Sequence, residues 1–185
     1  MNKPKQTCYN KKCLFFHDRP GQQGKSDLVK LYKILNKAQN RLDLCVYLFT
    51  EDKLFDFIEY LHSKRGVKIR ILTDAGTDQD VKVNNKASKL QDIGIEVKMN
   101  VQKTDSKFKG KMHNKFVIID EKTMIFGSFN WTINAILNND ESLVITSQEK
   151  LVEKFVDKFD DLWAKAEIFK IQEPTSAPTT NGSTD

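Results

Sequence analysis

The sequence contains no apolar run of membrane-spanning length, and it has only three cysteines and three histidines among its 185 residues. A helix that crosses a bilayer needs roughly 20 consecutive apolar residues, so no spanning segment is predicted. With three cysteines and no signal peptide, structural disulfides are not expected and a reducing compartment fits. Any chemistry that uses histidine must come from His17, His62 or His113.

The composition is that of a soluble globular protein, with 39% hydrophobic and 30% charged residues. A chain of 185 residues is long enough to form one domain with a real core. The net charge of +5 favours a polyanionic partner, either nucleic acid or an acidic lipid surface. Simple solubility is the alternative explanation of a modest positive balance.

Strand-like apolar runs alternate with amphipathic helical segments along the chain. Strands are predicted at residues 42–49, 67–73 and 95–99, and over the apolar segments that begin at residues 116, 125 and 143. Helices are predicted at residues 26–35, 50–66, 87–94 and 151–163. Strands that alternate with helices imply a sheet covered on both faces, which is an αβα sandwich.

The folded domain is predicted to span residues 26–170. An N-terminal segment, residues 1–25, precedes it, and residues 171–185, rich in Ser, Thr and Pro, form a disordered tail. Ser26 and Asp27 are predicted to cap the first helix. Thr50 is predicted to cap the second helix, and Gly66 to end it.

The segment KMHNKFVIID, residues 111–120, contains the pattern H-x-K-x4-D once. Its apolar, β-branched part predicts a buried strand, and side chains two apart share one face of a strand, which aims His113 and Lys115 together. Asp120 lies an odd number of residues from both, so its side chain is not expected on the face that carries them. It is expected to be an orienting or structural partner rather than a third group on that face. Histidine and lysine side by side suit an anionic phosphorus centre, because lysine neutralises an oxygen while neutral imidazole attacks.

The pattern alone arises by chance in roughly a few per cent of lysine-rich chains this long, so the residues that follow it matter. Gly127 permits a close backbone approach, and Ser128 and Asn130 offer hydrogen bonds at positions i and i+2. Glu141 precedes the next apolar strand, where its carboxylate can hold the far nitrogen of His113 and set the tautomer. The candidate substrate-binding residues are the lysines of the preceding loop, which would form an electrostatic funnel for phosphates: Lys103, Lys107, Lys109 and Lys111.

His113, Lys115 and Asp120, followed by Gly127, Ser128, Asn130 and Glu141, resemble the catalytic pattern of the phospholipase D superfamily. Within it, the chain is similar to the mitochondrial cardiolipin hydrolase family, also called Zucchini. The similar segments are residues 41–49, 66–74, 111–120 and 127–139. The resemblance implies an αβα sandwich with a central mixed sheet. It also implies an active site with two copies of the motif, and because this chain has one copy, a symmetric homodimer is expected.

The resemblance implies a mechanism in which His113 of one subunit attacks phosphorus and forms a phosphohistidine, while His113 of the other protonates the leaving oxygen. Lys115 and Asn130 would hold the non-bridging oxygens, with Ser128 assisting and Glu141 orienting the histidine. No metal is needed for this chemistry. The substrate implied first is single-stranded RNA, cut in small guide RNA production to leave a 5′-phosphate. The alternatives are cardiolipin, hydrolysed to phosphatidic acid, and a non-catalytic scaffold that binds nucleic acid.

Two expectations concern the N-terminal segment. Cys8, Cys13 and His17 are three candidate ligands of a structural zinc, although four ligands are normal. The family that the chain resembles carries a small Cys/His zinc module near its N-terminus. That family is anchored at the mitochondrial outer surface by a membrane-spanning helix, whereas residues 1–7 are polar, so the alternative location is the cytoplasm.

Overall fold

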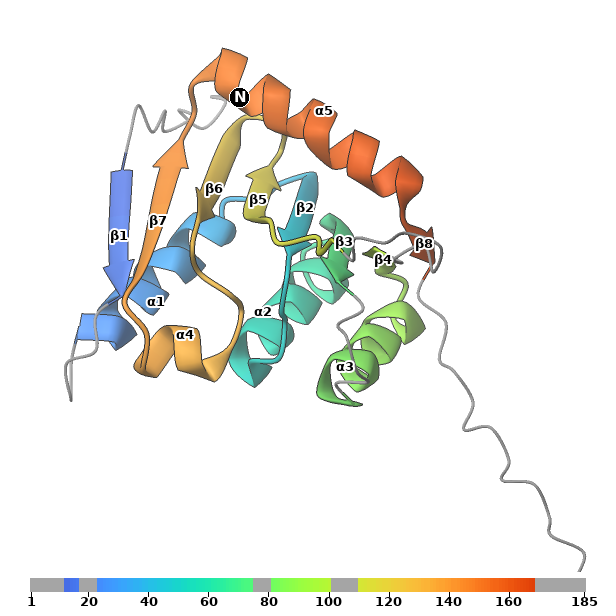
Figure 1. Ribbon diagram of the computed structural model, residues 1–185, viewed down its shortest axis with the longest axis horizontal. Helices are drawn as coiled ribbons and strands as arrows, with labels where there is room; N and C mark the ends of the chain where they lie inside the picture. The colour runs from blue at the N-terminus through green and yellow to red at the C-terminus, as the bar shows by residue number, and fades with distance from the viewer. Residues whose placement is uncertain (1–11, 17–22, 75–80, 101–109, 169–185) are drawn as a thin grey trace, which may run out of the picture.

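The computed structural model describes residues 12–16, 23–74, 81–100 and 110–168. Its strands form one sheet in the order β1-β7-β6-β5-β2-β3-β4-β8 (Figure 1). They are β1 (Lys12–Phe16), β2 (Arg41–Val46), β3 (Lys68–Asp74), β4 (Glu96–Asn100), β5 (Lys115–Ile119), β6 (Thr123–Gly127), β7 (Glu141–Thr146) and β8 (Glu167–Ile168). The β2–β3 and β3–β4 pairs are parallel and all others are antiparallel, which confirms the predicted mixed sheet.

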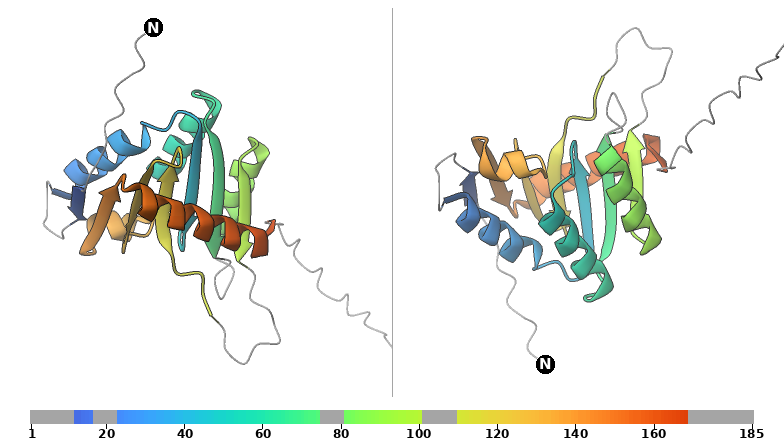
Figure 2. Two further views of the ribbon diagram at one scale, coloured as in Figure 1. Left: turned by 90° about the horizontal axis from the view of Figure 1, so that it is seen from above. Right: turned by 90° about the horizontal axis from the view of Figure 1, so that it is seen from below.

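Helices cover both faces of this sheet, as the alternation of strands and helices predicts. They are α1 (Gln23–Leu35), α2 (Asp52–Ser63), α3 (Val81–Asp92), α4 (Ile133–Leu137) and α5 (Glu149–Lys165). The long helix α5 crosses one face, and the other helices lie on the opposite face (Figures 1 and 2). No helix within the described ranges is long and apolar enough to cross a bilayer.

The strand β2 is buried on both faces, and its side chains divide between two apolar cores. Leu42, Leu44 and Val46 join the larger core beneath α1 to α4. Cys45 points to the other face and joins the core beneath α5. Burial raises the pKa of the Cys45 thiol to about 12, as expected of a thiol packed in an apolar core.

The ends of α2 show how local sequence sets its bounds. The N-cap is Glu51, whose carboxylate accepts a hydrogen bond from the backbone N–H of Leu54 at 2.6 Å, so the predicted cap at Thr50 is wrong by one residue. Beyond the helix, Gly66 has φ +68° and Val67 N–H donates to the carbonyl of Leu61. This left-handed turn confirms that Gly66 ends the helical segment.

The predicted boundary at residue 26 is wrong. The strand β1, residues 12–16, pairs along its length with β7, so this part of the N-terminal segment belongs to the sheet. The helix α1 begins at Gln23, and Asp27 lies inside it, where its carboxylate accepts from the ammonium of Lys30 at 2.7 Å. The boundary was missed because a strand of five residues with only two buried side chains, Leu14 and Phe16, carries a weak signal.

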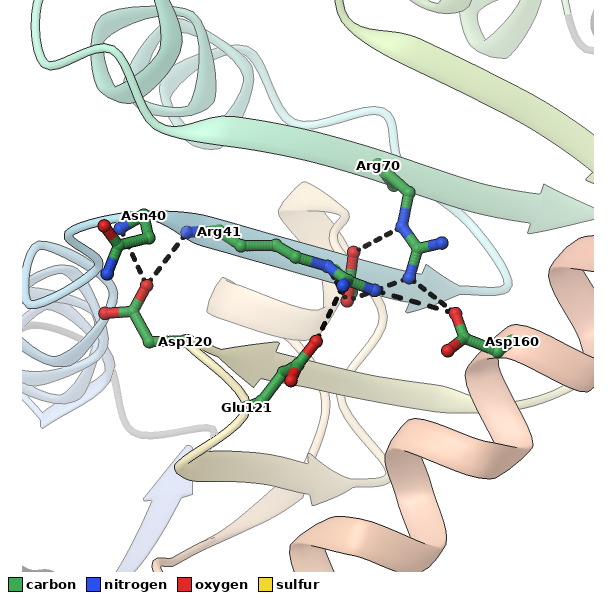
Figure 3. A network of polar contacts seen from close by, with 7 residues as sticks. Asn40, Arg41, Arg70, Asp120, Glu121 and Asp160 are labelled. Carbon is green, nitrogen blue, oxygen red and sulfur yellow. Dashed lines mark hydrogen bonds and ion pairs between the residues drawn. The ribbon is translucent and has the colours of Figure 1, made fainter.

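A polar network fastens α5 to the sheet (Figure 3). The Asp43 carboxylate, 1% exposed, lies 2.8 Å from Arg70 Nε and 2.7 Å from Arg41 Nε. Arg70 also reaches Asp160 of α5 at 2.7 Å, and Arg41 reaches Glu121 at 2.7 Å. Burial raises the pKa of Asp43 to about 6, although Arg41 opposes the shift.

This network predicts how stability depends on pH. Because the pKa of Asp43 is about 6 in the folded protein and 3.8 ordinarily, the folded state keeps a proton that the unfolded chain releases. Its stabilising contribution is present below about pH 4 and is lost as pH rises through 6. The unfolding free energy of wild type minus that of Asp43→Asn, measured by urea unfolding, should therefore grow on acidification from pH 7 to 4.5, by on the order of 1–3 kcal/mol. A difference in unfolding free energy that shrinks on acidification would mean that the ion pairs of Asp43 outweigh the effect of its burial.

Candidate active site

The predicted site residues gather at one end of the sheet because of its strand directions. The ends of β2, β3 and β6 meet the beginnings of β5 and β7 there. The register pairs Val46 with Lys115 and Gly127 with Leu143. Residues that are distant in the sequence therefore surround the start of β5, where His113 lies.

The structure brings His113 and Lys115 together, as the two-residue spacing predicts. The ammonium of Lys115 donates a hydrogen bond to the backbone carbonyl of His113 at 2.8 Å. The His113 side chain is exposed, and its ring lies 4.7 Å from the ring of Tyr47, centroid to centroid. Burial lowers the pKa of Lys115, and the nearby Glu141 carboxylate opposes that shift. The pair presents an accessible imidazole beside a partly desolvated cation.

A buried carboxylate that the sequence did not single out holds the segment before His113. Asp74, at the end of β3 and 2% exposed, accepts a hydrogen bond from the backbone N–H of Met112 at 2.7 Å. The Met112 side chain is buried, with its sulfur 3.4 Å from the sulfur of Cys45. The available signal was a carboxylate at the end of a strand whose middle is apolar, since a buried carboxylate needs a partner.

The second cluster of predicted residues forms around a close backbone approach. A Cβ atom on Gly127 would lie 1.9 Å from the carbonyl oxygen of Ser142, so only glycine fits there, as predicted. The Ser128 hydroxyl donates a short hydrogen bond to the Glu141 carboxylate and accepts from the backbone N–H of Ser142 at 3.1 Å. The other Glu141 oxygen accepts from the Asn139 amide at 3.1 Å.

Asn130 carries an unsatisfied polar atom. Its side-chain oxygen is buried and has no hydrogen-bond partner among the described residues. A buried unpaired acceptor costs about 1–3 kcal/mol, and such groups persist where function requires them. Asn130 is thus held in the site without an internal bond that would occupy its side-chain oxygen.

Known proteins are similar to this chain in sequence. Residues 31–163 match the family described as cardiolipin synthase, PLD-like domain. The chain belongs to the phospholipase D superfamily. The human protein named mitochondrial cardiolipin hydrolase is 35% identical over 140 residues, covering 76% of this chain and 52% of its own length. The protein of that name from Chlamydomonas reinhardtii is 36% identical over 138 residues, covering 75% and 58%. The chain thus spans little more than half the length of these relatives.

Solved structures of the superfamily share the fold. NucT from Helicobacter pylori has a TM-score of 0.71 at 22% identity, covering 86% of this chain and all of NucT. The phospholipase D family member Nuc from Salmonella typhimurium has a TM-score of 0.71 at 23% identity, covering 88% and 100%. At these identities the likeness concerns the fold alone, and it confirms the predicted phospholipase D-like architecture.

Within one copy of the chain, Glu141 has partners other than the expected nitrogen of His113, and its role in orienting that histidine stays a prediction. In the described structure its carboxylate does not bond to His113; it is bound by Ser128 and Asn139 instead. The physical reason is the contact at Gly127, which places the Ser128 hydroxyl directly against the start of β7. Within this phospholipase D-like site, Glu141 acts on Lys115 through its charge and on Ser128 through a hydrogen bond.

Asp120 does not join the catalytic cluster, which corrects its inclusion among the candidate catalytic residues. Strand β5 separates it from His113, and seven residues of extended chain span roughly 20 Å. Its carboxylate accepts backbone hydrogen bonds from Gln39 at 2.9 Å, Asn40 at 2.8 Å and Arg41 at 2.9 Å. Figure 3 shows the bonds from Asn40 and Arg41. Asp120 has φ +51° in the tight β5–β6 turn, a conformation that aspartate tolerates. This geometry fits the supporting role that was expected for Asp120.

The remaining predicted residues lie mostly outside the described ranges. Of the basic loop, Lys103, Lys107 and Lys109 are outside, and Lys111 is exposed, with its ammonium donating to the Tyr47 hydroxyl at 3.1 Å. Of the candidate zinc ligands, Cys8 and His17 are outside, and Cys13 is exposed on β1. The funnel and the zinc site therefore stay predictions.

Proposed function

We propose that this protein is a phosphodiesterase in which the imidazole of His113 attacks phosphorus. The observation that carries this proposal is the exposed His113 ring beside the partly desolvated Lys115 ammonium. An anionic phosphodiester needs a cation to neutralise its oxygens and a nucleophile that can leave again. Membership of the phospholipase D superfamily supports the same chemistry.

The reaction proceeds in two displacements. A nitrogen of His113 bonds to phosphorus, the bond from phosphorus to the leaving oxygen breaks, and a second, protonated imidazole gives that oxygen its proton. The same imidazole then takes a proton from water, whose oxygen attacks phosphorus and releases His113. Lys115 stabilises the negative oxygens throughout, and the side-chain N–H of Asn130 donates a hydrogen bond to one of them. Because lysine carries the neutralising charge, the proposed reaction requires no metal ion.

The second imidazole comes from another copy of the chain in this proposal. The sequence contains the motif once, and His113 is exposed at the end of the sheet, where a second copy can approach it. A twofold axis beside this end would bring two His113 side chains together in one site. The functional unit we propose is accordingly a homodimer.

The substrate that we propose first is single-stranded RNA, cut to leave 5′-phosphate ends. Lys111 and Lys115 bring two ammonium groups to the same aromatic ring, that of Tyr47, and the chain carries a net charge of +5. Cations beside an aromatic side chain are typical of surfaces that bind single strands. A ribose 2′-hydroxyl is not needed, because the enzyme supplies the nucleophile.

Cardiolipin is the second candidate substrate. The relatives named above carry that activity in their names, which also support a mitochondrial location for this chain, with the cytoplasm as the alternative. Ile133 and Leu137, four residues apart on α4 and 51% and 47% exposed, closely follow Asn130 in the sequence. Exposed apolar side chains of this kind can contact lipid.

One experiment compares the two substrates. Wild type should cleave 5′-labelled and 3′-labelled single-stranded RNA in excess chelator and leave 5′-phosphate ends. His113→Asn should lose at least about 1,000-fold in kcat because no nucleophile remains. His62→Gln, at the far end of α2, is the matched control and should keep its activity.

The same proteins are assayed on cardiolipin vesicles in the same buffer. Release of phosphatidic acid with RNA left whole would overturn the nuclease proposal and keep the phosphodiesterase. Binding of RNA with neither substrate cleaved would identify a non-catalytic scaffold. Activity lost in chelator and restored by a divalent ion would contradict the metal-independent mechanism.

The homodimer has its own test. Wild type and His113→Asn chains are unfolded together, refolded as mixtures, and assayed. If each site needs two His113 side chains, activity should follow the square of the wild-type fraction, so an equal mixture retains about a quarter of the activity. An equal mixture that retains about half of the activity, or an active sample that sediments only as monomer, would contradict the shared site.

A further inference from the structure

Tyr47 occupies a fixed position beside the motif segment. It directly follows β2, and its backbone carbonyl accepts a hydrogen bond from the Thr73 hydroxyl of β3 at 3.3 Å. Its side chain is half-buried. The backbone of Tyr47 is therefore held by the parallel pair β2–β3, whereas the side chains that its ring contacts belong to the segment that enters β5.

Three basic side chains of that segment converge on this one ring. The ring of His113 lies 4.7 Å away, centroid to centroid, at an interplanar angle of 55°. The ammonium of Lys115 lies 5.3 Å from the ring centroid. The ammonium of Lys111 lies 5.6 Å from the centroid and donates to the hydroxyl at 3.1 Å. All three side chains thus lie beside the ring, and of the three only Lys111 also hydrogen-bonds to the hydroxyl.

These contacts have a physical consequence for orientation. The face of an aromatic ring is negative, so it attracts ammonium groups, and tilted aromatic pairs are a favoured geometry. In the part of the chain that the structure describes, no side chain donates a hydrogen bond to the His113 ring or accepts one from it. The packing of Tyr47 is accordingly what restricts the direction of an otherwise exposed imidazole.

We propose that Tyr47 is a positioning residue of the site. Its ring orients His113 and Lys115, and its hydroxyl holds the exposed Lys111 beside them. This inference rests on the proposed phosphodiesterase reaction. The two halves of the side chain have separate tasks. The ring acts on the attack at phosphorus, and so on kcat. The hydroxyl acts on a lysine that meets the substrate phosphate, and so on KM.

Two substitutions of Tyr47 separate these tasks. Tyr47→Leu removes the ring, and kcat should fall about 10- to 100-fold, since a displacement of about 1 Å in a reacting group has effects of this size. Tyr47→Phe keeps the ring and releases Lys111, so KM should rise several-fold while kcat stays within about threefold of wild type. Tyr60→Leu, an exposed tyrosine on α2, is the matched control and should change neither constant.

A second measurement does not need turnover. The ring protons of His113, identified by their absence in His113→Asn, are followed by NMR. Because an aromatic neighbour shifts their resonances, they should move in Tyr47→Leu and stay near the wild-type positions in Tyr47→Phe. The Phe variant also covers the case in which the Leu variant does not fold.

Three outcomes would overturn the inference: kcat unchanged in a folded Tyr47→Leu, an equal loss of kcat in both variants, or His113 resonances that are indifferent to both. A failure of the proposed function has a different signature. In that case wild type cleaves neither RNA nor cardiolipin, while the His113 resonances still respond to the loss of the Tyr47 ring.

Discussion

The register of β5 between β2 and β6 is the constraint on which the site depends. It pairs Lys115 with Val46 and Phe116 with Phe126, so the start of β5 lies at the ends of both neighbours. A shift of one residue would turn every side chain of β5 to the opposite face. Both faces of β5 are buried, with Val117 and Ile119 in one core and Phe116 and Ile118 in the other. The apolar packing of both layers therefore fixes the place where His113 leaves the sheet.

The groups that support the chemistry come from elsewhere in the sheet. Asp74 ends β3 and holds the Met112 backbone, and Tyr47 follows β2 and packs on His113. On the other side, Gly127 permits β6 and β7 to approach closely enough for Ser128 to bind Glu141. The imidazole is thus placed by its own strand β5 and by residues at the ends of β2 and β3, and the network through Asp43 ties the same sheet to α5.

Local sequence patterns predicted a sheet with two covering layers, the adjacency of His113 and Lys115, and the close approach at Gly127, whereas the mixed strand directions were implied by the family resemblance. The local predictions follow from the alternation of strands and helices, from spacing within one strand, or from one residue type. The partner of Glu141 and the roles of Asp74 and Tyr47 depend on which strands pair, and spacing within a segment does not contain that information. The strand β1 was missed for the same reason, because its place is set by β7. Asp120 has the residue type of a catalytic group, but its turn directs it to the amides of residues 39–41.

The central claim is that His113 forms a covalent bond to phosphorus. The most direct measurement quenches turnover of RNA with internally labelled phosphates in alkali, where a phosphohistidine survives, and maps the labelled peptide by mass spectrometry. The label should be attached to His113, disappear on mild acid treatment, and be absent from His113→Asn. Steady turnover without a covalent adduct, or an adduct on another residue, would contradict the claim.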